Sequence, residues 1–170
     1  MKKKILALGC MAALLAFSSD AFAALGTATA TIGTAISITQ DAGGTNSGNL
    51  AFGHIIPGTG GTVTIAPDGT PTFSGNVTLT TQLTKSAAQF AVTGDAGKTY
   101  SVTLPLDNIV TITSGGNTMH VDSFTKSLAG AGTLDANGAQ TFKVGGTLTV
   151  GSGQPTGVYT GTFTVTAAYQ

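Results

Sequence analysis

The chain has 170 residues, 25 of them glycine, and its 7 lysines balance its 7 aspartates because neither arginine nor glutamate occurs. Only 8% of the residues are charged, which argues against the basic stripe that binds nucleic acid and the cationic patch that binds anionic lipid. Sparse charge also leaves little repulsion between copies of a protein, so the composition favours association.

The amino terminus has the pattern of a secretory signal peptide. Lysines at 2–4 precede an apolar run over 5–17, and Ala21-Phe22-Ala23 follows as an A-x-A cleavage site. A membrane anchor would need about 20 apolar residues, and a lipoprotein attached through Cys10 would need a longer apolar segment before the cysteine. We therefore expect export and removal of residues 1–23.

Cleavage would leave residues 24–170, enough for one domain with a core of its own. This mature chain keeps four lysines and six aspartates but loses Cys10, the only cysteine. A secreted domain without disulfides is held together by packing, by assembly, or by both. Abundant Thr, Gly, Val and Ala with little charge is typical of an all-β extracellular domain.

Short segments of alternating hydrophobicity recur along the mature chain, and no helical period persists. Turn sequences such as Pro67-Asp68-Gly69 and Ser114-Gly-Gly-Asn117 separate these segments. The pattern is typical of antiparallel sandwiches and barrels, and we predict a two-sheet β-sandwich. In chain order, the expected strands are 27–32, 35–39, 49–55, 62–66, 76–81, 89–93, 99–104, 109–113, 118–124, 140–144, 147–150 and 158–169.

Residues two apart in a strand point to the same face, so parity predicts the core. One domain is expected over 34–170, preceded by an amino-terminal arm over 24–33. The predicted core residues are Leu50, Phe52, Val63, Ile65, Val77, Leu79, Phe90, Val92, Tyr100, Val102, Leu104, Val110, Ile112, Met119, Val121, Phe142, Val144, Leu148, Val150, Phe163 and Val165.

Few side chains are candidates for chemistry. His120 and Asp122 share a face of one predicted strand, but no third metal ligand is visible and nothing brings His54 to them, so solvent-facing positions are expected. The loop 135–138 has a composition that calcium sites use, yet turns select the same residues and the chain has no glutamate to end the calcium pattern. There is also no G-x-S-x-G elbow. We predict no catalytic, metal-binding or cofactor-binding residue.

The end of the chain alternates almost without interruption. Threonines at 160, 162, 164 and 166 would face solvent, and the residues between them would face a core: Tyr159, Gly161, Phe163, Val165, Ala167 and Tyr169. This pattern predicts a half-buried strand over 158–169.

Two residues at the two ends of this segment lie at informative distances from the end of the chain. Tyr169 is penultimate and Gly157 is the fourteenth residue from the end. A penultimate aromatic residue and a glycine at that distance resemble the carboxyl-terminal signature of pilins assembled by the chaperone–usher route. The resemblance implies an incomplete immunoglobulin-like sandwich, whose groove takes a strand of a periplasmic chaperone and then, at an outer-membrane usher, the amino-terminal extension of the next subunit. The disulfide near the first strands of many such pilins is missing here.

Further motifs resemble those of a bacterial secreted family known only as domain of unknown function 4402, over about residues 30–169. Two of these elements, around Leu50 and around Tyr159, also resemble the spore coat U family of archaic chaperone–usher subunits. The motifs are Leu50-Ala-Phe52-Gly53, Phe90-Ala-Val92-Thr-Gly94, Val144-Gly-Gly-Thr-Leu148 and Gly157-Val-Tyr159-Thr-Gly161-Thr-Phe163-Thr-Val165.

The arm after the predicted cleavage site has the pattern of a strand with one buried face, because small apolar residues at even positions alternate with Leu25 and threonines. At about 0.8 kcal/mol per buried CH₂ these side chains contribute modestly, so main-chain hydrogen bonds would carry much of the affinity for a partner. The residues expected to bind a partner are Ala28, Ala30, Ile32, Gly157, Tyr159, Phe163, Val165 and Tyr169.

These patterns predict a non-enzymatic structural subunit of a bacterial surface fibre, which passes through the periplasm and self-associates by donor-strand exchange. The alternative is a self-contained secreted module that binds carbohydrate or protein, although three tyrosines and no tryptophan offer few aromatic platforms. A sandwich complete within one chain, with its last strand paired on both sides and the arm folded in, would argue against assembly.

Overall fold

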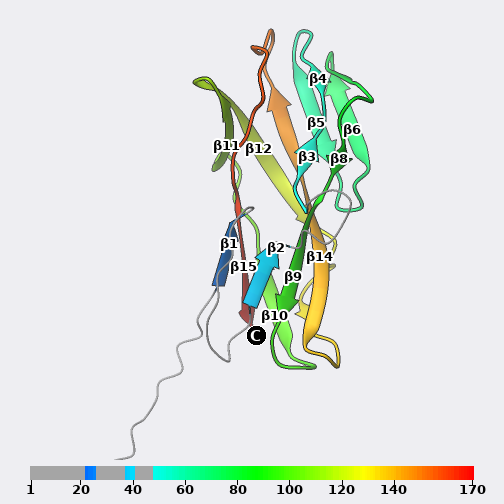
Figure 1. Ribbon diagram of the computed structural model, residues 1–170, viewed down its shortest axis with the longest axis vertical. Helices are drawn as coiled ribbons and strands as arrows, with labels where there is room; N and C mark the ends of the chain where they lie inside the picture. The colour runs from blue at the N-terminus through cyan, green and yellow to red at the C-terminus, as the bar shows by residue number, and fades with distance from the viewer. Residues whose placement is uncertain (1–21, 26–36, 41–47) are drawn as a thin grey trace, which may run out of the picture.

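The computed structural model describes residues 22–25, 37–40 and 48–170, and it describes side chains from residue 48 onward. The regular structure of these residues consists of antiparallel β-strands, with no helix. Figure 1 shows an elongated molecule in which strands of two main sheets run along the long axis. The prediction of an all-β sandwich is confirmed.

Four strands form the smaller main sheet, in the order β1-β15-β10-β13. Its centre is the pair β10 (Thr99–Thr103) and β15 (Thr164–Tyr169), which runs from Tyr100 opposite Tyr169 to Thr103 opposite Thr166. Its edges are β13 (Gly132–Thr133) and β1 (Phe22–Leu25).

The larger sheet has seven strands arranged around β14 (Ala139–Val150). Along one edge, β14 pairs first with β9 (Ala88–Thr93) and then with β5 (Gly61–Ile65), while β12 (Asn117–Lys126) takes the other edge. The outer strands are β2 (Ser37–Gln40) beside β9, β6 (Pro71–Gly75) beside β5, and β11 (Val110–Ser114) beside β12. Two short ladders pair β3 (Ala51–Phe52) with β8 (Lys85–Ser86) and β4 (Ile55–Ile56) with β7 (Thr78–Leu79).

The continuity of β14 corrects a prediction. Sequence analysis expects two strands separated by Gly145-Gly146, but the structure has one strand through both glycines. They lie where β14 exchanges β9 for β5 as its neighbour. A Cβ on Gly145 would lie 2.1 Å from the carbonyl oxygen of Ile65, so this glycine permits a close approach of two backbones and does not mark a turn.

The edge strand β6 is absent from the sequence prediction. It follows a tight turn in which Gly69, at a φ of 91°, donates its N–H to the carbonyl of Ala66 at 2.8 Å. Pro71 then opens the strand at the sheet edge, where its missing N–H need not break the ladder. The segment therefore pairs as an edge although its proline suggests a loop.

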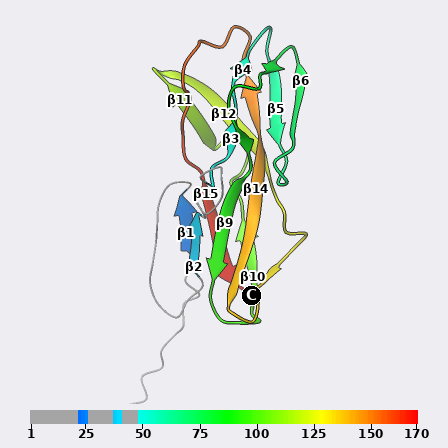
Figure 2. The same ribbon diagram turned by 45° about the vertical axis from the view of Figure 1, so that its right-hand side comes forward.

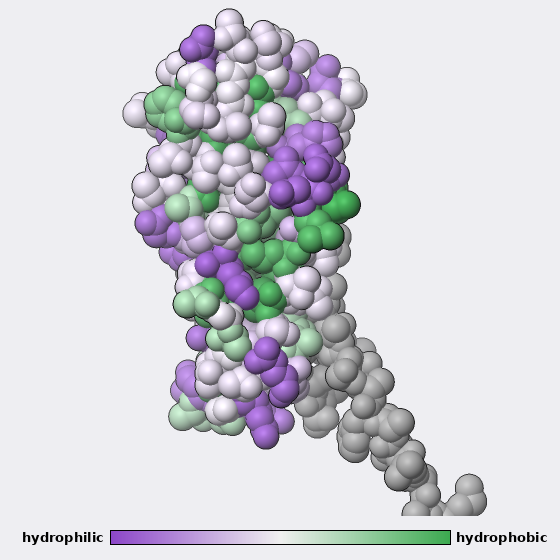
Figure 3. Space-filling model, turned by 180° about the vertical axis from the view of Figure 1, so that it is seen from behind, coloured by the Kyte–Doolittle hydropathy of each residue, from purple (hydrophilic) through white to green (hydrophobic). Residues whose placement is uncertain are grey.

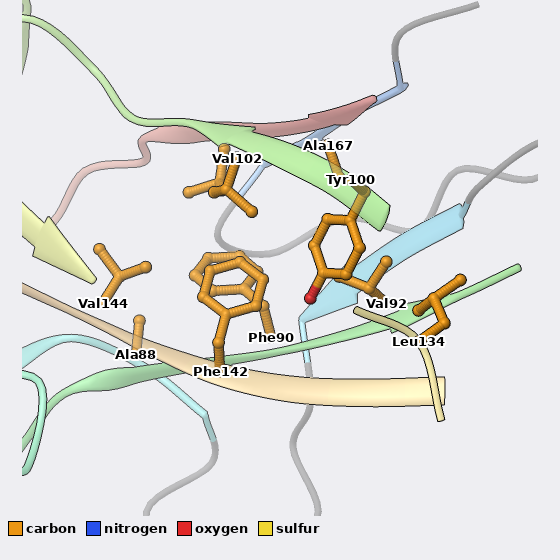
Figure 4. Packing of buried hydrophobic residues seen from close by; sticks show 10 residues of the cluster. Ala88, Phe90, Val92, Tyr100, Val102, Leu134, Phe142, Val144 and Ala167 are labelled. Carbon is orange, nitrogen blue, oxygen red and sulfur yellow. The ribbon is translucent and has the colours of Figure 1, made fainter. Parts of the chain in front are cut away.

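The core consists of two clusters, one in each half of the molecule. The lower cluster lies around β9, β10 and β15, in the lower half of Figure 1. In it, Phe90 and Phe142 stack with ring centroids 5.6 Å apart, and Phe163 meets Phe90 edge-on at 6.0 Å. Figure 4 shows Tyr100 and Val102 reaching from β10 toward these rings. The buried residues of the upper cluster are Val63, Val77, Val110, Met119, Val121, Leu148 and Val150. Most of the core predicted by parity is thus buried.

Candidate functional site

The terminal strand β15 is paired on both flanks in this chain. On one flank it pairs with β10, and on the other it pairs antiparallel with β1, with Phe22 opposite Ala167 and Ala24 opposite Val165. This pairing counts against an open groove beside residues 164–167 of the strand. Figure 2 shows β1 and β2 side by side in the same half of the molecule as β15.

The pairing of β1 has a second feature that bears on function. Its four residues span the predicted cleavage site, because Phe22 and Ala23 precede the site and Ala24 and Leu25 follow it. Removal of residues 1–23 would therefore leave only half of this ladder. Only the uncleaved chain covers the outer flank of β15 from Thr164 to Ala167.

The segment before β15 is extended but lies outside the sheets, which corrects the predicted strand over 158–169. Its single bridge joins Thr160 to Thr113 of β11 through two backbone hydrogen bonds of 2.9 and 3.0 Å. A Cβ on Gly157 would lie 2.3 Å from Ser114 Oγ, and one on Gly161 would lie 2.5 Å from the carbonyl oxygen of Thr111. The two glycines thus let this segment lie close against β11.

Tyr159 anchors the upper part of this segment. Its hydroxyl donates to the carbonyl oxygen of Pro155 at 2.8 Å and accepts from Nε2 of Gln154 at 2.9 Å. The ring is half-buried and packs against the upper core cluster. Tyr159 therefore faces inward, as the alternation predicts.

A cavity of about 630 Å³ lies beside this segment. Its floor is apolar and comes from β11, β12 and β14, through Val110, Ile112, Met119, Val121, Leu148 and Val150. One wall is formed by residues 154–163 and the other by residues 49–55 and Pro57. The upper half of the sandwich is therefore hollow next to the terminal segment, whereas the lower half is filled by the aromatic cluster. Sequence analysis could not reveal this cavity, because its walls come from segments about 100 residues apart.

Five of the predicted partner-binding residues share one extended stretch of chain. Val165 is fully buried, Tyr159, Phe163 and Tyr169 are half-buried, and Gly157 is exposed. The other three, Ala28, Ala30 and Ile32, lie outside the described residues.

The candidate ligands His54, His120 and Asp122 do not come together as a metal site. His54 Nδ1 lies 3.1 Å from Thr80 Oγ1, and Asp122 Oδ1 accepts the backbone N–H of Asn108 at 2.7 Å. In the described part of the chain, no group of three or more His, Cys, Asp or Glu side chains is placed to hold a metal ion.

Sequence analysis did not predict that Asp122 belongs to a reciprocal pair with Asp107. The carboxylate of Asp107 accepts the N–H of Ser123 at 2.7 Å while that of Asp122 accepts the N–H of Asn108. Asn108 and Ser123 both have positive φ, 64° and 50°, so the two carboxylates hold two unfavourable backbone conformations. The Asp107-Asn108 dipeptide is the only sequence signal for this reciprocal pair of hydrogen bonds.

The loop with calcium-like composition is held by its own aspartate. The carboxylate of Asp135 accepts the N–H groups of Ala139 and Asn137 at 2.9 and 2.8 Å, and these hydrogen bonds lower the pKa of Asp135. Asp68 has the same role in the turn before β6, where the N–H of Thr70 lowers its pKa. Both carboxylates thus stabilise turns.

The surface agrees with the sparse charge of the chain. On the face shown in Figure 3, most residues have intermediate hydropathy and the hydrophilic ones form scattered groups. The described residues contain no helix that is long and apolar enough to cross a membrane.

The family model described as Domain of unknown function (DUF4402) matches residues 36–169, which is most of the chain. The chain belongs to the DUF4402 family. The predicted resemblance to this family is thereby confirmed. No curated protein and no solved structure matches this DUF4402 protein.

Proposed function

We propose that the protein is a non-enzymatic structural subunit of a bacterial surface fibre, assembled by adding a β-strand beside the terminal strand of each copy. The observation that carries the proposal is the position of β1 across the predicted cleavage site. Once residues 1–23 are removed, only Ala24 and Leu25 remain opposite β15, at Val165 and Thr164. A two-residue pairing holds the flank weakly, and an arm that displaces it finds a sheet edge, to which an added strand binds through main-chain hydrogen bonds.

The sequence supports the same proposal. The predicted signal peptide provides export, and the pilin-like position of Gly157 and Tyr169 suggests a periplasmic chaperone and an outer-membrane usher as partners in transit to the cell surface. The subunit would then be an immunoglobulin-like sandwich completed by a neighbour's strand.

The cavity beside residues 154–163 favours a second candidate function. Its volume of about 630 Å³ lies within the range of small-molecule sites, and its apolar floor would suit an apolar ligand. A self-contained binding module would keep this cavity free for such a ligand and would remain monomeric.

Truncation of the arm tests the proposal. The full precursor and a variant that lacks residues 24–33 are produced with the same signal peptide and export host. We expect polymers from the first and monomers from the second, because the second has no strand to donate. A length-matched control carries Thr→Ser at positions 27, 29 and 31, which keeps the inward residues, and should still polymerise. Polymers from the truncated variant, detected by electron microscopy or native gels, would refute assembly through this arm.

A further inference from the structure

We infer that the apolar cavity is the upper half of an acceptor slot, and that residues 26–32 of a second copy fill it in the register that β1 and β15 already set. This inference rests on the proposed function, since it specifies where and how the added strand binds. The acceptor residues are all described: the floor on β11, β12 and β14, and the wall over 154–163.

The register follows from the observed pairs. Leu25 lies opposite Thr164, and Ala24 lies opposite the buried Val165. Directly opposite residues of an antiparallel pair share a face, so even-numbered residues of an arm continued in this register face the core. These are the positions whose small apolar side chains the sequence predicts to be buried.

Continued beyond β1, this register places Gly26 opposite Phe163, Ala28 opposite Gly161, Ala30 opposite Tyr159 and Ile32 opposite Gly157. The two aromatic acceptors thus meet the two small residues Gly26 and Ala30. The largest inward residue of the arm, Ile32, lies opposite Gly157, at the end of the slot that Ser114 of β11 bounds. Such alternation of large and small side chains lets facing positions interlock.

A slip of one residue would destroy this match. It would turn the threonines at 27, 29 and 31 toward the apolar floor and expose the alanines, because the side-chain period of a strand is two. Hydroxyl groups buried there without partners would cost free energy. The hydrophobic pattern of the arm therefore fixes the register.

The arm of the same copy cannot fill this slot. Ser37 begins β2 opposite Thr93, and Phe22 begins β1 opposite Ala167. Both strands start at the end of the molecule where β9 turns into β10, and they run in the same direction (Figures 1 and 2). A chain that leaves β1 at its upper end must come back before it enters β2.

The distances exclude an intramolecular path. From Leu25 to Ile32, a strand in the proposed register advances about 23 Å. The return from Ile32 to Ser37 would have to cover that length and the length of β1, about 33 Å in all. Five residues span at most about 18 Å. A second copy has no such constraint while its arm is free, so its residues 26–32 can occupy the whole slot.

The experiment uses cysteine pairs in the exported full-length protein, whose only native cysteine, Cys10, lies in the predicted signal peptide. Thr27→Cys in one preparation is mixed with Thr162→Cys in another under mild oxidation. These positions are directly opposite in the proposed register, Thr162 is exposed, and directly opposite residues meet the Cα separation that a disulfide needs. We expect a crosslinked heterodimer on a non-reducing gel, lost on reduction.

The control pairs Thr29→Cys with Thr162→Cys, which are offset by two residues, and should give no crosslinked product. Equal crosslinking of the offset pair would overturn the register. A chain with both Thr27→Cys and Thr162→Cys that closes only within itself would overturn the intermolecular claim. Polymers that form without the Thr27–Thr162 crosslink would refute this slot but leave strand addition standing, whereas a protein that forms neither would refute both.

Discussion

The hydroxyl of Tyr169 accepts a hydrogen bond of 2.6 Å from the backbone N–H of Asp95, 74 residues earlier in the chain. The edge of its ring lies against Gly94, where a Cβ would come within 2.2 Å of the hydroxyl oxygen. The penultimate aromatic residue therefore ties the end of β15 to the turn between β9 and β10. It closes the lower end of the sandwich within its own chain.

This contact predicts that Gly94→Ala destabilises the protein. The added methyl group must displace the tyrosine ring, and overpacking of this kind costs about 1–3 kcal/mol. Gly130→Ala is a matched control, because a Cβ there meets nothing within 4 Å. Urea unfolding of both variants measures the difference, and equal midpoints would contradict the close fit of Tyr169 over Gly94.

The lower aromatic cluster predicts a contrast between two phenylalanines. Phe142 is fully buried and stacks on Phe90, so Phe142→Ala should lower the free energy of unfolding by about 3–5 kcal/mol. Phe73 on the edge strand β6 is 58% exposed, and Phe73→Ala should change it by less than about 0.5 kcal/mol. Thermal unfolding of the two variants checks this order. Similar losses from both substitutions would mean that β6 is covered in solution.

The turn aspartates predict a loss of stability in acid. Hydrogen bonds from Ala139 and Asn137 lower the pKa of Asp135 in the folded protein. A lowered folded pKa contributes stability above the pKa of the unfolded chain, and this contribution is lost as the pH falls through the folded pKa. We expect urea midpoints to decrease on the acidic side of the usual aspartate range. Asp135→Asn should lose less stability than the unaltered protein on the same acidification, and an equal loss would refute this role of Asp135.

Strand parity predicted much of this fold because a two-residue period is a local property of the chain. Phe90 and Val92 are buried together for that reason, as are Val63 and Ile65. The errors arose where tertiary contacts decide. Gly145-Gly146 has the composition of a turn, but a neighbouring backbone requires it within a strand.

The terminal segment shows the same limit. Residues 158–163 alternate as a strand does, yet they lie against β11 through one bridge and leave a cavity beside them. Alternation indicates which side chains face inward, but it does not indicate whether a neighbouring strand is paired with the segment. The inward orientation of Tyr159 and Phe163 was therefore predicted correctly. The cavity next to them depends on segments that are distant in the sequence and that only the fold brings together.

The position of β1 predicts that the start of the chain controls strand uptake. A protein over 22–170 keeps the whole ladder beside β15, whereas one over 24–170 keeps half of it. Net hydrogen-bond contributions of about 1 kcal/mol each imply that the longer form unfolds at higher urea concentration. The shorter form should bind a labelled peptide with the sequence of residues 22–32 more tightly, because its flank is more open, and fluorescence anisotropy measures this.

A third form with Phe22→Ser and Ala23→Ser separates the effect of backbone pairing from that of the two side chains. If the ladder is what occupies the flank, this form should resist the peptide nearly as well as the unaltered 22–170 chain, since serine keeps every backbone donor and acceptor. If it binds the peptide as the 24–170 chain does, the backbone ladder is not what closes the site. Equal peptide binding by the 22–170 and 24–170 chains would show that β1 does not guard the edge of β15, and it would remove the main support for assembly at that edge.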